Sequence, residues 1–120
     1  MAHILIVDDS PTEVHVLTSM LEGAGHTVYS ANNGEAGIEM AKELKPSLIL
    51  MDVVMPGMNG FQATRQLTRA EETANIPVII VTTKDQETDR VWGLRQGAKD
   101  YLTKPVDEAQ LMGKISEFAG

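Results

Sequence analysis

Short apolar runs alternate along the whole chain with longer stretches in which apolar residues recur at helical spacing. The apolar runs cover residues 3–7, 26–31, 47–52, 76–81 and 99–103. A run without polar alternation is typical of a strand that is buried on both faces of a sheet. Leu48-Ile49-Leu50-Met51 shows this best and predicts a central strand, whereas the more polar run 26–31 indicates a strand nearer an edge.

Capping residues and glycines mark where the helices begin and end. Ser10, Pro11 and Glu13 form a typical helix start, because Ser10 suits the N-cap, Pro11 the first turn and Glu13 a capping box. Gly23 and Gly25 then end this helix. Further helices are predicted after the caps Asn33 and Asp107, and over Gly60–Ala70 and Asp85–Gln96.

Five alternations of strand and helix predict an α/β fold with a parallel sheet covered by helices on both faces. Right-handed crossovers leave few topologies, and five strands suit a flavodoxin-like, doubly wound (βα)5 sheet of order 2-1-3-4-5. The first, third and fourth strands are then neighbours. Asp8-Asp9, Asp52 and Thr82 follow these strands and are expected to meet in one crevice.

Composition restricts the classes of protein that fit this pattern. At 120 residues and 42% hydrophobic, the chain is expected to form a single domain, residues 1–120, whose core needs no disulfide. The absence of cysteine excludes thiol chemistry, and the net charge of −7 argues against binding to nucleic acid or anionic membranes. No signal peptide or bilayer-spanning run is present, so the sequence predicts a cytoplasmic acidic domain.

The expected crevice gathers carboxylates, a hydroxyl and an ammonium, from Asp8, Asp9, Asp52, Thr82 and Lys104. Close carboxylates repel one another, so without a cation at least one of them would have a raised pKa. Mg²⁺ relieves this repulsion, because it binds carboxylates and bridges to phosphate oxygens. With Mg²⁺ and Lys104 the acids are nearly neutralised and a phosphoryl group can be accommodated. Since aspartyl phosphates are known covalent intermediates, Asp52 is a candidate nucleophile.

Four segments carry a resemblance to the response-regulator receiver family. They are Ile6–Ser10, Leu50–Gly60, Val81–Thr83 and Gly97–Pro105. Together these motifs are highly specific, and the resemblance extends over essentially the whole chain. Within the family, the sequence resembles the stand-alone receivers of chemosensory systems that govern twitching motility by type IV pili. The resemblance implies a two-component phosphorelay module that catalyses only its own phosphorylation and dephosphorylation.

The family resemblance implies a role for each crevice residue. Asp52 is the expected phospho-acceptor, and a phosphohistidine on a sensor kinase is the expected phosphodonor. Asp8 and Asp9 are expected to organise Mg²⁺, with Asp9, Asp52 and the backbone carbonyl of Val54 as direct ligands. The sequence therefore leads to Mg²⁺ as the cofactor and to a histidine kinase as the partner.

The resemblance also implies how phosphorylation is transmitted to a partner. Lys104 contacts the phosphoryl group, and its peptide bond to Pro105 is usually cis in the family. Thr82 closes on the phosphoryl group and Tyr101 turns inward with it. The face built from the fourth helix, the fifth strand and the fifth helix is then reshaped to bind a downstream protein.

Other functions fit parts of the pattern. A phosphatase of the haloacid dehalogenase type usually has a second acid two residues after its nucleophile, where this chain has Val54. A flavin carrier would have a hydroxyl- and glycine-rich phosphate loop in place of Asp8-Asp9. The receiver hypothesis is therefore preferred. No output domain is expected after the last helix, so the protein either contacts a partner or serves as a phosphate sink for a sister receiver.

Large apolar side chains outside the crevice are expected to pack in the interior. Trp92, on the fourth predicted helix, is the only tryptophan and is predicted to lie wholly or partly in the core. Met51, Met55 and Met58 surround the predicted acceptor and are expected to pack in the core or the loop.

Overall fold

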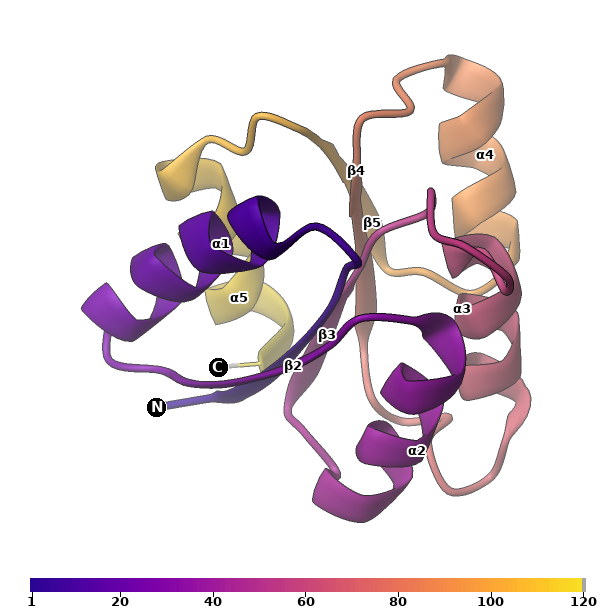
Figure 1. Cartoon of the computed structure of the whole chain (residues 1–120), viewed down its shortest axis with the longest axis horizontal. Coiled ribbons are helices and arrows are strands. Elements are labelled where there is room, and N and C mark those ends of the chain that lie inside the picture. The colour runs from indigo at the N-terminus through magenta and orange to yellow at the C-terminus, as the bar shows by residue number, and fades with distance from the viewer. Residues whose placement is uncertain (120) are drawn as a thin grey trace.

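The computed structural model describes residues 1–119, which form a central sheet between two layers of helices (Figure 1). The elements follow in the order β1 (His3–Val7), α1 (Pro11–Gly23), β2 (Thr27–Ala31), α2 (Gly34–Leu44), β3 (Leu48–Met51), α3 (Gly60–Arg69), β4 (Val78–Thr82), α4 (Glu87–Arg95), β5 (Asp100–Thr103) and α5 (Glu108–Ala119). The alternation of strands and helices predicted from the sequence is confirmed.

The five strands form one parallel sheet in the order β2-β1-β3-β4-β5. This confirms the predicted flavodoxin-like topology, and β2 is an edge strand, as its polar sequence indicates. Val7 at the end of β1 is in register with Met51 at the end of β3. Asp8 and Asp52, the residues that follow, therefore leave the sheet side by side.

The central strand β3 is buried on both faces, which explains its uninterrupted apolar sequence. Leu48 and Leu50 pack in a cluster with residues of α1 and α5, whereas Ile49 and Met51 pack with residues of α2 and α3. Successive side chains of a strand point to opposite faces, so a strand covered on both sides has an apolar residue at every position. In Figure 1, α1 and α5 lie on one side of the sheet and α2, α3 and α4 on the other.

Several boundaries differ by one or two residues from those expected from the sequence; the strand expected over residues 76–81, for example, is Val78–Thr82. The helix α4 begins at Glu87 and not at Asp85, because Gln86 is an N-cap with extended backbone angles (φ −76°, ψ 146°). Residues 83–86 consequently form a loop after β4. The strand expected over residues 99–103 begins at Asp100, and the strand expected over residues 26–31 begins at Thr27.

Ser10 caps α1, but without the predicted capping box. The amide of Glu13 donates to the Ser10 hydroxyl at 3.3 Å, as expected. The amide of Ser10, however, donates to Asp8 Oδ1 at 2.9 Å. The prediction of a reciprocal box is wrong because Asp8 takes the amide that the Glu13 carboxylate would accept from. The other two caps, Asn33 and Asp107, accept backbone amides as predicted.

Trp92 lies on the surface, so its prediction as a core residue is wrong. It is 48% exposed, and its neighbour Val91 is 41% exposed. The side of α4 that faces the sheet is occupied by Gly93, where a Cβ would lie only 2.8 Å from Ile80 Cδ1. Because α4 approaches the sheet through a glycine, the adjacent indole has no interior position available and points away from the sheet.

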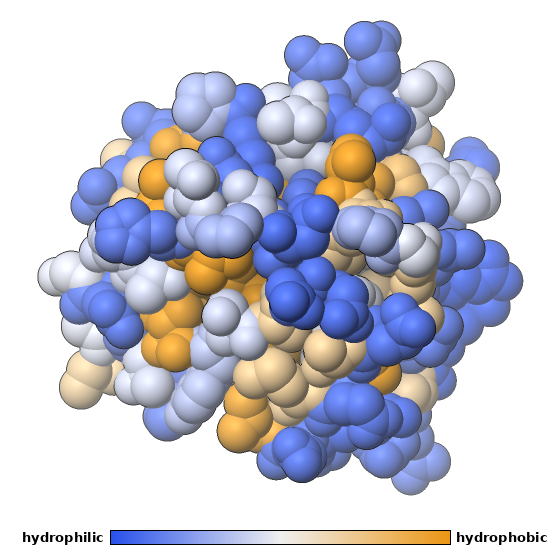
Figure 2. All heavy atoms as spheres, in the orientation of Figure 1, coloured by the Kyte–Doolittle hydropathy of each residue, from blue (hydrophilic) through white to orange (hydrophobic). Residues whose placement is uncertain are grey.

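The surface of the described residues is mainly polar. Figure 2 shows hydrophilic side chains over much of the visible face, with hydrophobic ones gathered mostly toward its centre and left. Within residues 1–119, none of the helices has both the length and the apolar character that crossing a bilayer would require.

Candidate functional site

Three carboxylates meet where β1 and β3 end, as predicted. Asp8, Asp9 and Asp52 each offer one carboxylate oxygen, and these oxygens lie within 4.8 Å of one another. Asp8 and Asp52 are buried, whereas Asp9 is exposed. The amide of Asp52 donates to the carbonyl of Val7 at 2.9 Å, which extends the pairing of the strands to the site itself. The cluster is therefore rigid at its base and open to solvent at Asp9.

Hydrogen bonds orient the two buried carboxylates differently. Asp8 uses both oxygens, since Oδ1 accepts from the amide of Ser10 at 2.9 Å and Oδ2 from Lys104 Nζ at 2.7 Å. Asp52 Oδ1 accepts from the amide of Val53 at 2.8 Å. Asp52 Oδ2 lies 3.7 Å from Lys104 Nζ, beyond hydrogen-bond distance. Asp52 thus keeps one oxygen less constrained than either oxygen of Asp8.

The electrostatic environment of Asp52 favours a nearby cation. Burial raises the pKa of Asp52, and the charge of Asp8 raises it further. The ammonium of Lys104 and the amide of Val53 lower this pKa without cancelling the effect. A divalent cation would favour the ionised carboxylate. The oxygen donors suit Mg²⁺, which binds a few carboxylates and retains several waters, so this cluster is a candidate cation site.

Lys104 reaches the carboxylates from the end of β5. Its ammonium is 2.7 Å from Asp8 and 3.7 Å from Asp52, and its side chain is only 7% exposed. The amide of Lys104 donates to the carbonyl of Thr82 at 2.8 Å, which ties the end of β5 to the end of β4. The peptide bond between Lys104 and Pro105 is cis, as the family resemblance implies.

Glu13 is a neighbour of the site that was assigned only a capping role from the sequence. Its Oε2 lies 3.9 Å from Lys104 Nζ, so a fourth carboxylate borders the crevice. Glu13 lies in the first turn of α1, which begins two residues after Asp9. Its place directly after the Asp8-Asp9 motif is the sequence signal that could have identified Glu13.

Thr82 and Tyr101 lie on neighbouring strands beside the carboxylates. Thr82 is fully buried, and its hydroxyl accepts from the amide of Lys84 at 3.4 Å. Tyr101 is buried as well, and its hydroxyl donates to the carbonyl of Lys84 at 2.7 Å. Burial, with a smaller contribution from the charge of Asp89, raises the pKa of Tyr101 to about 12. Both predicted switch residues therefore contact the same loop after β4.

The loop between β3 and α3 returns closely to Asp52. The amide of Gly60 donates to the carbonyl of Val53 at 3.0 Å, and a Cβ at Gly60 would lie 1.9 Å from the carbonyl oxygen of Asp52. Val54 is 58% exposed, so its side chain points to solvent. Of the loop methionines, Met55 is buried and Met58 half-buried. The glycine allows α3 to start directly against the backbone of Asp52.

Cavities open on the surface both beside the carboxylate cluster and along α3. One, of about 740 Å³, opens beside Asp8 and Asp9 between α1 and α2, and it gives the exposed side of the cluster access to solvent. The other, of about 730 Å³, lies on the outer side of α3 and is not lined by the cluster.

Comparisons with known proteins agree with this geometry. Residues 4–116 match the family model described as the response regulator receiver domain. The chain is 67% identical over 116 residues to Protein PilH of Pseudomonas aeruginosa, which covers 97% of this chain and 96% of that protein. It is 40% identical over 114 residues to the response regulator PleD of Caulobacter vibrioides, covering 95% of this chain but only 25% of PleD.

Solved structures show the same architecture. The receiver domain of the sensor histidine kinase PA1611 from Pseudomonas aeruginosa, solved with a magnesium ion coordinated in its active-site cleft, has a TM-score of 0.91 and 31% identity over 99% of this chain and 98% of that one. The Vibrio cholerae chemotaxis protein CheY4 has a TM-score of 0.91 and 27% identity over 98% of each chain.

Proposed function

The chain belongs to the response regulator receiver domain family, and on this premise we propose that Asp52 accepts a phosphoryl group from a phosphohistidine of a sensor kinase. The observation that carries the proposal is the position of Asp52, which is buried between two further carboxylates and the ammonium of Lys104. In the transfer, an Asp52 oxygen forms a bond to phosphorus as the bond between phosphorus and the imidazole nitrogen breaks.

Different residues around Asp52 are proposed to bind the cation and to contact the phosphoryl group. We assign Asp9, Asp52 and the carbonyl of Val54 as ligands of Mg²⁺, and Asp8 as the residue that organises them, since both of its oxygens are already hydrogen-bonded. When bound, Mg²⁺ would neutralise charge on the phosphoryl oxygens. Lys104, 3.7 Å from Asp52, is placed to contact the same oxygens from the other side.

Addition of Mg²⁺ is expected to stabilise the folded protein, because the cation binds the native cluster and has no such site in the unfolded chain. At a concentration about 100 times the dissociation constant, the expected gain in the free energy of unfolding is about 2.7 kcal/mol. Thermal unfolding with and without Mg²⁺ measures it. Asp9→Asn should lose most of this increase in the free energy of unfolding. The control Asp107→Asn, at an exposed helix cap, should keep it. Equal increases in both variants would contradict the ligand assignment.

We infer that the phosphorylated state is transmitted through Thr82. The Thr82 hydroxyl accepts from the amide of Lys84, and the carbonyl of Lys84 accepts from the Tyr101 hydroxyl. If Thr82 turned toward a phosphoryl group, it would release the amide of Lys84, and the loop would be held by Tyr101 alone. Tyr101 is already directed inward, which leaves Thr82 as the residue that moves. The proposed consequence is a change in the face formed by α4, β5 and α5, where a downstream protein would bind.

The 67% identity to Protein PilH supports placing this signal in the control of type IV pilus twitching motility, in agreement with the resemblance of the sequence. We propose that the chain acts in the cytoplasm as a regulatory module and not as an enzyme on other substrates. A role as a phosphate sink is the second candidate, since the exposed opening at Asp9 also allows a phosphoryl group to be lost to water.

Phosphotransfer from a purified sensor kinase, phosphorylated on histidine, tests the proposed function. We expect the kinase to lose its label to this chain with Mg²⁺ present and to retain it after chelation. A panel of kinases identifies the fastest donor. Transfer that is unaffected by chelation would contradict the proposal. Rapid loss of label to inorganic phosphate in the presence of a sister receiver would favour the sink over a signalling output.

A further inference from the structure

The outer faces of α3 and α4 collect the residue types that dominate protein interfaces. The chain has four arginines, and all of them lie on these two helices, at positions 65, 69, 90 and 95. Its only tryptophan, Trp92, is on α4 as well and is 48% exposed. Arginine and tryptophan are enriched among the residues that carry most of the binding energy at interfaces. The chain as a whole has a net charge of −7, so the gathering of its arginines on two neighbouring helices differs from the general acidic character.

The two helices form one continuous surface. On α3, Arg65 and Arg69 are exposed and spaced i, i+4, which places them on one face. On α4, Val91 and Trp92 lie four and three residues before Arg95, so these three side chains are also neighbours. We call the set Arg65, Arg69, Val91, Trp92 and Arg95 the arginine surface.

A hydrogen bond joins the two halves of this surface. Thr68 of α3 donates from its hydroxyl to the carbonyl of Gln96, directly after α4, at 2.7 Å. Arg69 and Arg95 are each adjacent in sequence to one member of this pair, so they flank the same junction. The packing there is tight, because a Cβ at Gly97 would lie 2.6 Å from the Thr68 hydroxyl. The arginine surface is therefore presented on a rigid support.

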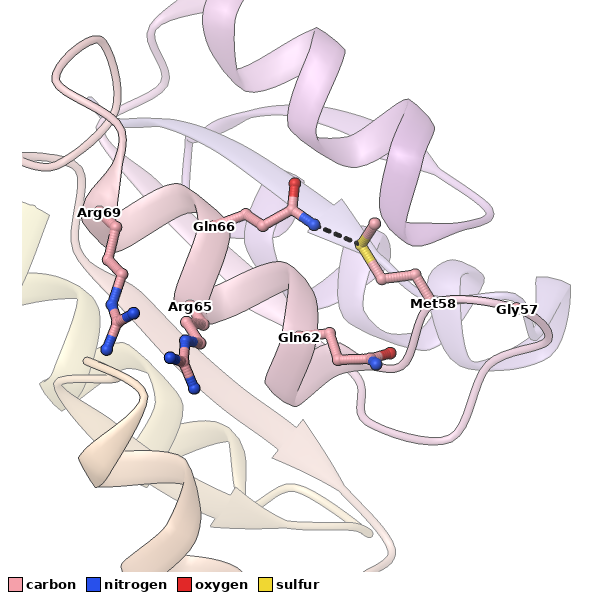
Figure 3. A pocket seen from close by; sticks show the side chains of 6 residues that line it. All are labelled: Gly57, Met58, Gln62, Arg65, Gln66 and Arg69. Carbon is pink, nitrogen blue, oxygen red and sulfur yellow. Dashed lines mark hydrogen bonds between the residues drawn. The ribbon is translucent and has the colours of Figure 1, made fainter.

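The α3 half of the surface borders a groove of about 730 Å³ (Figure 3). It is lined by Gly57, Met58, Gln62, Arg65, Gln66 and Arg69. The amide of Gln66 is directed to the sulfur of Met58 at 3.9 Å, whereas Arg65 and Arg69 extend to the other side of α3. The groove therefore has Met58 on one side of α3, while the guanidinium groups of Arg65 and Arg69 lie on the other side and are free to meet a partner.

The positive charge of this surface is not matched within the molecule. Among residues 1–119, no carboxylate lies within 4.0 Å of a guanidinium nitrogen of Arg65, Arg69 or Arg95. Arg69 and Arg95 sit in the last turns of their helices, where a positive charge is favourable. Arg65 is not in a last turn, and its spacing from Arg69 brings two like charges together, which destabilises a helix. Within residues 1–119, this pair of like charges therefore has no side-chain counter-charge.

We propose that the arginine surface binds an acidic partner protein through a helix that carries carboxylates at i, i+4 around one large apolar side chain. The carboxylates pair with Arg65, Arg69 and Arg95, and the apolar side chain packs against Trp92 and Val91. The net charge of −7 does not prevent this contact, because at physiological salt charges are screened beyond roughly 8 Å. The proposal is independent of the phosphorylation of Asp52.

This surface is distinct from the face formed by α4, β5 and α5. Burial raises the pKa of Asp100 in β5, but Lys114, the amide of Tyr101 and, to a smaller extent, the charge of Arg90 together hold it below its ordinary value. Arg90, the remaining arginine, thus acts toward β5. It therefore belongs to the opposite side of α4 and provides a matched control of the same residue type on the same helix.

A second copy of this chain is a less suitable occupant. The exposed face of α2 carries Glu35, Glu39 and Glu43 at successive i, i+4 positions, which would complement the arginines. However, α2 and α3 pack together over the same face of the sheet, in one hydrophobic cluster. Pairing α2 of one copy with α3 of another would be head-to-tail, and such contacts extend into chains or rings and do not close as a dimer.

Trp92 fluorescence provides the test, because no other tryptophan contributes to the emission. The probe is a synthetic helical peptide of about 20 residues, free of aromatic residues, with glutamates at i, i+4 and i+8 beside a leucine. We expect a saturable change in emission with this peptide. The dissociation constant should rise about tenfold in the double variant Arg65→Gln/Arg69→Gln and stay unchanged in Arg90→Gln. Circular dichroism of each variant confirms that it is folded.

Four outcomes would overturn the proposal. A peptide with glutamine in place of glutamate could bind as tightly, which would remove the electrostatic basis. Arg90→Gln could weaken binding as much as the double variant, which would place the contact on the other side of α4. Emission could fail to saturate at millimolar peptide. Sedimentation could show self-association that Glu39→Gln abolishes, which would make a second copy the occupant.

Discussion

Replacing Gly60 with alanine is expected to lower the free energy of unfolding by about 3 kcal/mol. A Cβ at this position would lie 1.9 Å from the carbonyl oxygen of Asp52 and 2.8 Å from the Cα of Val53. Both obstacles are backbone atoms, so neither can be relieved by a rotamer change, and the start of α3 must move. Equilibrium unfolding in urea measures the loss.

Gly113 is the matched control for this substitution. It lies within α5, is exposed, and a Cβ there would meet no atom within 4 Å. Alanine is the better helix former, so Gly113→Ala is expected to stabilise the protein by about 0.5–1 kcal/mol. Changes of the same sign and size at both glycines would show that the close approach of α3 to Asp52 does not occur in solution.

Replacing Lys104 with alanine is expected to lower the free energy of unfolding by about 3–5 kcal/mol at neutral pH in the absence of Mg²⁺. The ammonium is buried against Asp8 at 2.7 Å and lies near Asp52, so its removal leaves two buried carboxylates without a counter-charge. Added Mg²⁺ is expected to restore part of the loss, since it supplies positive charge to the same oxygens. Thermal and urea unfolding measure both effects.

The pH dependence of the Lys104→Ala variant follows from the carboxylates. Burial raises the pKa of Asp52, and the ammonium of Lys104 counteracts it, so the variant raises this pKa further. A carboxyl whose pKa is higher in the folded state destabilises that state when ionised. The deficit should therefore be largest at neutral pH and shrink as the pH falls toward the ordinary value of 3.8. Lys114→Ala, which removes a half-buried partner of Asp100 away from the cluster, should cause only a small change. A deficit in Lys104→Ala that does not vary with pH would contradict the account.

The architecture could be predicted because the signals for it are local and repeated. An uninterrupted apolar run such as Leu48–Met51 already implies a strand covered on both sides, and the right-handed crossover rule then restricts the order of the strands. The crevice follows from this order alone, since Asp8, Asp52 and Thr82 end neighbouring strands. The structure confirms that these residues lie together.

The two features that the sequence did not predict, the cap at Ser10 and the exposure of Trp92, each depend on which of two neighbouring residues occupies a position. The capping box at Ser10 fails because the carboxylate of Asp8, not that of Glu13, receives the amide. Trp92 is exposed because Gly93 takes the position that faces the sheet. An apolar residue of a helix can be predicted as buried only if the face that packs on the sheet is known. The helix α4 has nine residues, and its apolar positions are too few to define that face.

The most direct test of the role of Asp52 is to locate the phosphoryl group after incubation with acetyl phosphate and Mg²⁺. Mass mapping of the peptides is expected to find one phosphoryl group per chain, on the segment that contains Asp52. Asp52→Asn should abolish the modification, and Asp85→Asn, in the exposed loop after β4, should leave it intact. A phosphoryl group that persists in folded Asp52→Asn would contradict the assignment of Asp52 as the acceptor.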